Sequence, residues 1–300
     1  MKRKIIKQAN QAYTITLPIE WIRNNGLSNK DEIDIEMLEK SLLIKTNNSK
    51  VGEKTKVDLT GMSKRMIYQT ISALYVKGYD EIDISSKEDL SDLVPEIMSN
   101  LIGYAVISQK DNEYKIKDLN FGNYPHLDEV FKRVFQIILV FFQSAIKDVF
   151  GEEKENITNL KSRDIEVNKF CLYLQRAINK SSYPDQIKGR ALFTYSFELE
   201  KIGDEIERFW RTNVKYHPKK NKEIKILAET CLEGLEKAFD GLHISNKNSL
   251  GEIYALREKV REKSMSIKIN DPHSIRMTRH LVKIVEEAAD LNPLNLLIKY

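Results

Sequence analysis

The feature that most constrains the fold is a change in pattern at about residue 126. From there onward, apolar residues recur every three or four positions, which is the spacing of one face of an α-helix. Short breaks divide this part of the chain into six predicted helices, at about 126–150, 156–181, 185–215, 219–243, 248–268 and 271–298. Short connections make neighbouring helices antiparallel, so the pattern predicts an all-α domain over 126–300 built from two three-helix bundles.

The preceding segment, 56–120, alternates short strand patterns with helical ones. Strands are predicted at 56–59, 81–84, 104–109 and 114–119, and helices at 63–77 and 91–101. Ser63 is a typical helix N-cap, and Gly78 is a typical helix terminator. This alternation indicates a small α/β module with a mixed sheet. The segment contains no phosphate-binding loop, so its role is not evident from the sequence.

Residues 1–46 show the pattern of a small, mainly β domain. A strand is predicted at 13–17, a helical turn at 19–23, and a strand pair at 31–36 and 41–45 joined at Glu39-Lys40. A unit of this size cannot bury its own apolar faces well, and dimerisation is the simplest remedy. Residues 47–56 are polar and are predicted to be a linker.

Charge and cysteine content narrow the functional class. The net charge of +4 is too modest for a general nucleic-acid binder, although the first thirty residues contain six basic residues against a single acid, Glu20. No run of eighteen apolar residues and no signal-peptide pattern is present, which predicts a cytoplasmic protein without membrane insertion. Cys171 and Cys231 are isolated thiols, and we expect both to be core residues in a reducing compartment.

The predicted helix at 197–211 carries two different surfaces. One is an apolar stripe that contains Leu199, Ile202, Ile206 and Phe209. The other is an acidic edge formed by Glu200, Asp204 and Glu207. Like charges at this spacing repel by a few tenths of a kcal/mol per pair, so a cation facing the edge is one interpretation. A solvated acidic face with Arg208 and Arg211 nearby is the other.

The preceding helix supplies possible partners for this edge. Asp164 lies on its predicted buried stripe, and Asn168 follows one turn later. If the two helices touch, four oxygen-bearing side chains converge, which predicts a site for a divalent or trivalent metal ion such as iron, Mn, Mg, Zn or Ca. A salt bridge from Lys161, Arg163 or Arg190 would also satisfy Asp164.

A shift of 82 residues reveals a degenerate internal repeat. Leu281–Glu286 matches Leu199–Asp204, but Val282 stands in the place of Glu200. On the preceding helix Glu252 and Leu256 take the places of Asp164 and Asn168. The repeat therefore predicts a weak or absent second metal site, with Glu252, Glu286 and Asp290 as its candidate ligands.

The histidines do not indicate catalysis. His126, His217, His243, His273 and His280 form no metal-protease spacing, and no serine or cysteine stands in a nucleophile elbow. Capping and surface roles are expected for all five, and we expect no enzymatic activity. The rival hypothesis is a metal-dependent hydrolase that uses Asp164, Glu200 and Asp204.

Two stretches of the helical part resemble a known family. Glu198-Leu199-Glu200-Lys201-Ile202-Gly203-Asp204 is similar to the signature helix of the PhoU family, and Arg163-Asp164-Ile165-Glu166-Val167-Asn168 resembles its companion motif. The resemblance implies a regulator of phosphate uptake or of its transcription, with metal-binding helical bundles. It also implies a phosphate transporter ATPase or a sensor kinase as the partner.

The N-terminal segment resembles a second family. A basic strand, Leu17-Pro18, Trp21-Ile22-Arg23, Gly26-Leu27, Asp31-Glu32-Ile33 and Leu42-Leu43-Ile44 follow the order of the swapped-hairpin domain of the AbrB, MazE and SpoVT family. The resemblance implies a homodimer and DNA contacts from Lys2, Arg3, Lys4, Lys7 and Arg23. A domain that only dimerises is the alternative. This second resemblance implies, as an alternative function for the whole chain, a transcription regulator or antitoxin whose helical domain senses an effector.

Overall fold

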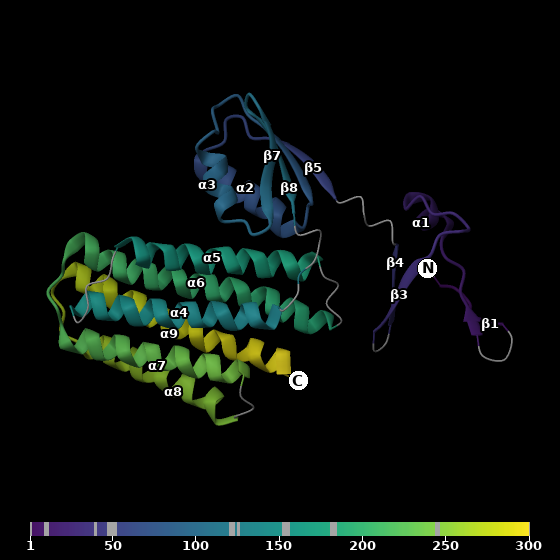
Figure 1. Cartoon of the computed structure of the whole chain (residues 1–300). Coiled ribbons are helices and arrows are strands. Elements are labelled where there is room, and N and C mark those ends of the chain that lie inside the picture. The colour runs from purple at the N-terminus through teal and green to yellow at the C-terminus, as the bar shows by residue number, and fades with distance from the viewer. Residues whose placement is uncertain are drawn as a thin grey trace. The chain divides into compact units, whose positions relative to one another are not determined.

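The computed structural model describes residues 2–8, 12–38, 41–46, 53–119, 124, 127–151, 157–180, 185–243 and 247–299. The chain divides into two compact units, Met1–Gly52 and Glu53–Tyr300 (Figure 1). The expected mixed class is confirmed, because strands occur near the N-terminus and the C-terminal region is mostly helical.

The first unit contains two short hairpins and one short helix. Strands β1 (Ile6–Gln8) and β2 (Ala12–Thr14) pair antiparallel, as do β3 (Ile33–Leu38) and β4 (Ser41–Thr46). Helix α1 (Ile19–Asn24) follows Pro18. The strand predicted at 13–17 ends at Thr14 instead, because Thr14 pairs with Ile6, the first residue of the partner strand β1. Pro18 has no N–H with which the hydrogen bonding could continue. The predicted Glu39-Lys40 connection and residues 47–52 of the predicted linker lie outside the described residues.

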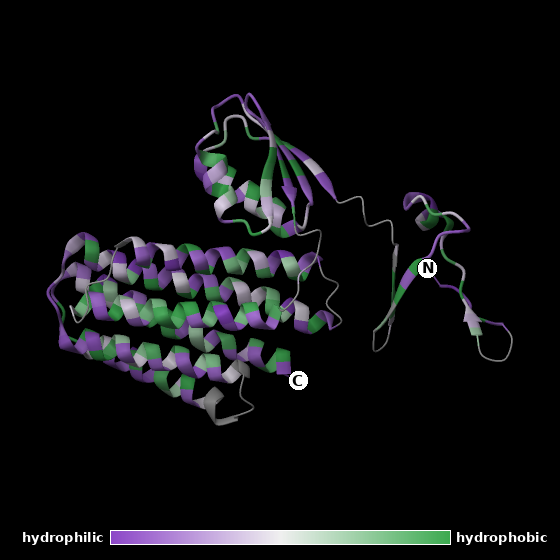
Figure 2. Ribbon diagram, in the orientation of Figure 1, coloured by the Kyte–Doolittle hydropathy of each residue, from purple (hydrophilic) through white to green (hydrophobic). Residues whose placement is uncertain are grey.

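The first unit leaves its hydrophobic side chains exposed. None of its described side chains is buried. Met37 is 84% exposed and Tyr13 is 67% exposed. Hydrophobic residues are visible along the open strands in Figure 2. The unit therefore has no hydrophobic core of its own among its described residues.

The second unit begins with a four-stranded mixed sheet. Its elements are β5 (Lys54–Asp58), α2 (Lys64–Lys77), β6 (Glu81–Ser85), α3 (Leu93–Ser99), β7 (Tyr104–Lys110) and β8 (Glu113–Asp118). The strand order is β5-β6-β8-β7, with β5 and β6 parallel and the other pairs antiparallel. The Ser63 hydroxyl caps α2 by accepting from the Met66 N–H, and Gly78 ends α2 in the left-handed conformation at φ +103°, as predicted.

Long helices follow at all six predicted places in the described part of the chain. They are α4 (Leu127–Phe150), α5 (Ile157–Lys180), α6 (Gln186–Tyr216), α7 (Lys222–His243), α8 (Lys247–Ser266) and α9 (Pro272–Lys299). The predicted helix start at His126 and the predicted break at Tyr183-Pro184 lie outside the described residues. None of the described helices is both long and apolar enough to cross a membrane.

The long helices pack around one continuous hydrophobic core, and α6 contacts α9 more extensively than it contacts any other helix. Helices α4, α5 and α6 contact one another, α7, α8 and α9 contact one another, and α6 packs along α9 and α4 along α7. Helix α4 is coloured mostly as hydrophobic in Figure 2, and its buried residues lie in the centre of the core. The predicted stripe of α6 is fully buried, and Cys171 and Cys231 are buried free thiols, as expected.

A buried arginine joins residues 53–119, which we call the sheet module, to α5. Arg176 is fully buried, and its guanidinium donates to Asp118 Oδ2 at 2.7 Å, to the Tyr75 carbonyl at 2.6 Å and to the Tyr124 hydroxyl at 2.8 Å. The rings of Tyr75 and Tyr104 lie 4.9 and 4.8 Å from the guanidinium carbon. Helix α2 packs against α5 beside this network. The sheet module is therefore attached to α5.

Candidate functional site

The predicted acidic edge lies beside a close approach of α5 and α6. A Cβ atom added at Gly203 on α6 would lie 3.0 Å from Cγ1 of Val167 on α5. Val167 is itself fully buried. The missing side chain of Gly203 therefore allows the two helices to come together beside Asp204, and the acids of both helices share one neighbourhood.

Asp164 and Asn168 on α5 have polar atoms without partners. The Oδ1 atom of each is buried and accepts no hydrogen bond in the described part of the chain. The predicted alternative of a salt bridge from Lys161, Arg163 or Arg190 to Asp164 is not formed among the described residues. An unpaired buried oxygen costs about 1–3 kcal/mol. A ligand, or a bound proton in the case of Asp164, would remove this cost.

The electrostatics of the edge follow from burial and from like charges. Burial raises the pKa of Asp164 to about 7, and the charges of Glu207, Asp204 and Glu200 contribute to the rise. Burial and the charge of Asp204 also raise the pKa of Glu200. Burial raises the pKa of Glu207, although Arg211 opposes the change. The predicted acids thus lie close enough for the charges on α6 to raise the pKa of Asp164 on α5.

Two of the three α6 acids are partly neutralised by arginines of the same helix. Asp204 Oδ2 accepts from Arg208 Nη2 at 2.6 Å, and Glu207 lies 3.3 Å from Arg211 Nη2. Glu200 forms no ion pair with any described residue. Within the described ranges no three Asp, Glu, His or Cys side chains lie close enough together to hold one metal ion. The structure thus gathers the predicted ligands on one edge without a closed cage of three acids.

The acidic edge opens into a pocket of about 680 Å³. Asn168 and Glu200 lie on one wall, and α2 of the sheet module forms the opposite wall with Tyr68 and Ser72. Leu172 and Phe197 are among the apolar lining residues. Burial raises the pKa of Tyr68, and the charge of Glu200 raises it further. The sequence did not indicate that the sheet module would cover this edge.

The acids predicted for a second site have other surroundings. Glu252 pairs with Lys237 Nζ at 2.7 Å, and Glu286 pairs with Arg261 at 2.9 Å. Asp290 is exposed. Because the first two acids already have basic partners and the third faces solvent, this half of the chain offers a poorer cation site than the first.

A buried carboxylate on α6 was missed by the sequence analysis. Glu205 is only 2% exposed, and its oxygens accept from Lys283 Nζ at 2.7 Å and from Arg208 Nη1 at 2.5 Å. Its Oε2 lies 2.6 Å from His280 Nδ1. Burial raises the pKa of Glu205, but the hydrogen bonds from Lys283, His280 and Arg208 outweigh that effect and hold it below its ordinary value. Glu205 thus ties α6 to α9.

The expectation of capping or surface roles is therefore wrong for His280, which is buried on α9. His217 caps the end of α6, and His273 stacks on Tyr216 with ring centroids 3.9 Å apart. His126 and the side chain of His243 lie outside the described residues.

The 82-residue repeat contained a signal for the missed cluster. The shift aligns Glu205 with Glu287 and Lys201 with Lys283. Burial raises the pKa of Glu287 to about 7, and its Oε2 has no partner among the described residues. The repeated acids thus both lie at the contact between α6 and α9, but only Glu205 is fully paired.

The residues predicted to contact DNA are accessible. Lys2, Arg3, Lys4, Lys7 and Arg23 are all exposed. No ion pair involves any of them within the described part of the chain. Their charges are therefore available to an anionic partner.

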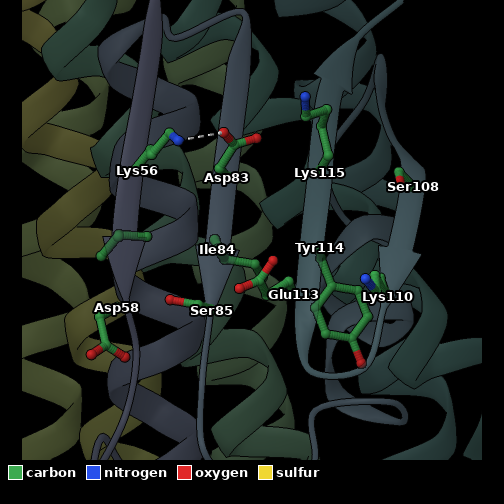
Figure 3. Close-up of a pocket in the computed structure, with 11 residues that line it drawn as sticks. Lys56, Asp58, Asp83, Ile84, Ser85, Ser108, Lys110, Glu113, Tyr114 and Lys115 are labelled. Atoms are coloured by element: carbon green, nitrogen blue, oxygen red, sulfur yellow. Dashed lines mark ion pairs between the residues drawn. The ribbon is translucent and has the colours of Figure 1, made fainter.

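A second hollow, of about 570 Å³, lies on the sheet (Figure 3). Lys56 on β5 and Asp83 on β6 point toward one another there at 3.7 Å, and Lys115 and Glu113 also line the hollow. Its charges are of both signs, and the Lys56 side chain is 85% exposed. The arrangement is that of a solvated sheet face rather than a focused site.

The two charged clusters on α6 share one residue. Arg208 donates to Asp204 of the acidic edge through Nη2 and to Glu205 through Nη1.

Comparison with protein-family models, with curated proteins and with solved structures finds no match to this chain.

Proposed function

We propose that this protein is a non-enzymatic regulator of the PhoU type, which couples phosphate status to phosphate uptake or to its transcription through a metal-binding helical domain. The observation that supports it most strongly is the pair of unpaired Oδ1 atoms on Asp164 and Asn168 beside the acids of α6. The contacts among α4, α5 and α6 and those among α7, α8 and α9 support the double bundle of that family.

The metal would be held by oxygen atoms. Asp164, Asn168 and Glu200 have free capacity, and Asp204 and Glu207 would join by giving up their contacts with Arg208 and Arg211. Carboxylate and amide oxygens suit a hard cation. When bound, the ion supplies the positive charge that the buried carboxylates lack. In this proposal the ion has a structural role or mediates a contact with a partner.

The proposed partners follow from the two units. The exposed apolar strands of residues 1–46 support a swapped-hairpin domain that completes its core with a second copy, giving a homodimer. The helical domain would contact a phosphate transporter ATPase or a sensor kinase. Replacing Met37 by Lys should shift the protein toward monomer in sedimentation, whereas Met265→Lys, at a similarly exposed helical position, should not.

One observation favours a second candidate. The exposed and unpaired Lys2, Arg3, Lys4, Lys7 and Arg23 support an AbrB or MazE-type transcription regulator or antitoxin, whose helical domain senses an effector. Each phosphate neutralised by such residues adds salt-dependent affinity. Enrichment of specific genomic fragments at low salt, lost when these residues are replaced by Ala, would favour this candidate. Binding no better than to random DNA would count against it.

The metal is tested by elemental analysis of protein purified without chelator. We expect a near-stoichiometric metal in the wild type and its loss in Asp164→Ala and Asp204→Ala. The matched control is Asp290→Ala, an exposed acid on α9, which should retain the metal. Equal trace metal in all four proteins would refute the site.

A further inference from the structure

The C-terminal end of α6 and the N-terminal part of α9 enclose a small basic pocket that no part of the proposed function uses. Its volume is about 300 Å³. Arg208, Arg211 and Lys215 of α6 and Arg276 of α9 line it, together with Tyr216 and His280. No carboxylate is among its lining residues.

The cations of this pocket are only partly neutralised. Arg208 bonds to Asp204 and Glu205, and Arg211 contacts Glu207. Lys215 and Arg276 form no ion pair with any described residue. Four cations therefore line the pocket, and two of them have no counter-charge among the described residues, which creates a positive potential in a concave site.

Neighbouring side chains hold the walls of the pocket in place. Glu205 fixes the His280 ring through Nδ1 and Arg208 through Nη1, so it acts as a positioning residue for both. The Tyr216 ring stacks on His273 with an interplanar angle of 11°, and Lys215 Nζ lies 5.1 Å from the centre of the same ring. Pre-positioned side chains lose less entropy when a ligand binds.

His280 lies beside these cations and lines the same pocket. Burial lowers its pKa, and although Glu205 raises it, Arg276 and Arg208 lower it again. The buried Nε2 atom has no hydrogen-bond partner among the described residues. One side of the ring is thus committed to Glu205, and the other retains polar capacity.

We propose that this pocket binds a phosphoryl dianion, either free inorganic phosphate or the phosphate group of a small metabolite. A phosphate group carries about −1.5 to −2 charges at neutral pH and offers three acceptor oxygens, which suits a pocket with several cations. Guanidinium groups match phosphate oxygens in geometry and bind them with charge-assisted hydrogen bonds. A single carboxylate would neutralise less of the charge. The volume suits a small ligand rather than a nucleotide chain.

The test is calorimetric titration of the full chain in chelator, at constant ionic strength, with inorganic phosphate and with glycerol 3-phosphate. We expect one-to-one binding, with the tighter of the two identifying the source of the phosphate group. Arg276→Gln and Lys215→Gln together should weaken binding by about tenfold or more. The matched control is Arg279→Gln, an exposed arginine on α9 that does not line the pocket and should stay within about twofold of wild type.

Two results would overturn the proposal. One is no binding of either compound below about 10 mM, far weaker than the contacts of a specific site. The other is an equal loss of affinity in the control and in the pocket variants, which would indicate general charge screening. Because chelator is present, the outcome does not depend on the metal site, and a failed metal analysis would leave this test intact.

Discussion

Arg176 and Asp118 form a fully buried ion pair, in which Nη2 donates to Oδ2 at 2.7 Å. Arg176 comes from the middle of α5, and Asp118 ends β8 of the sheet module. The guanidinium also donates hydrogen bonds to the Tyr75 carbonyl and the Tyr124 hydroxyl, and these further stabilise its buried charge. This pair links α5 to the sheet module, as does the contact of Lys180 Nζ with Asp80 Oδ1 at 2.7 Å.

Replacing Arg176 by Met should therefore loosen the sheet module from α5. Breaking a buried ion pair removes the cation that faces Asp118, which costs roughly 3–5 kcal/mol. Urea unfolding and hydrogen exchange over 53–119 would measure the loss. Arg133→Met is the control, because its pair with Glu166 at 3.3 Å is largely exposed and should cost less than about 1 kcal/mol. Equal effects of the two variants would contradict the proposed role of Arg176.

Local features of the fold were predictable because they depend on neighbours in the sequence. The buried stripe at Leu199, Ile202 and Ile206 follows from helical spacing alone. The Ser63 cap depends on an N–H three residues later. The acidic edge was equally local, since three of its members stand on one helix.

The missed features all join distant parts of the chain. Arg176 looks like an ordinary helix charge in the sequence, and its partner Asp118 is 58 residues away. Glu205 and His280 are 75 residues apart and come from the two halves of the repeat. Spacing within one helix carries no information about such pairs. The cover of the acidic edge by α2 could not be predicted for the same reason.

Stability should depend on pH through Asp164 when no metal is present. Its pKa of about 7 in the folded chain lies above the ordinary 3.8, so between these values the folded state holds a proton that the unfolded state has lost. The free energy of unfolding should therefore rise as the pH falls from 8 toward 4. Glu287, with a pKa also raised to about 7, should contribute in the same direction.

The variant that isolates this effect is Asp164→Asn. It should be more stable than wild type at pH 8 in chelator, because it removes a buried unpaired charge. Its pH dependence should be shallower, with the contribution of Glu287 remaining. Asp290→Asn, at an exposed position, should follow the wild-type curve. A wild-type slope in Asp164→Asn would show that Asp164 does not hold the proton.

Gly203 should be required for the close contact between α5 and α6. Alanine is favoured over glycine in a helix by about 1 kcal/mol, but here its Cβ would meet Val167 at 3.0 Å in a fully buried place. Overpacking typically costs about 1–3 kcal/mol, so Gly203→Ala should be neutral to destabilising in urea unfolding. Gly251→Ala in α8 has open space around its Cβ and should instead stabilise the protein by up to about 1 kcal/mol. Stabilisation by both variants would show that the helices can separate without cost.

Asp204 should restrain the anion pocket that it does not line. Its Oδ2 holds Arg208 at 2.6 Å, and Arg208 is one of the pocket cations. Asp204→Asn keeps the shape of the side chain and removes its charge, leaving the guanidinium freer to bind a phosphoryl group. Because a partly exposed pair is worth about 0.2–1 kcal/mol, phosphate affinity in chelator should rise by up to about fivefold. Glu252→Gln, whose partner Lys237 lies on α7, serves as the control and should leave the affinity unchanged. An Asp204→Asn protein that binds phosphate no better than wild type would mean that the acidic edge and the basic pocket act independently. An increase would instead couple them through Arg208, so that any cation drawing Asp204 away would also strengthen anion binding.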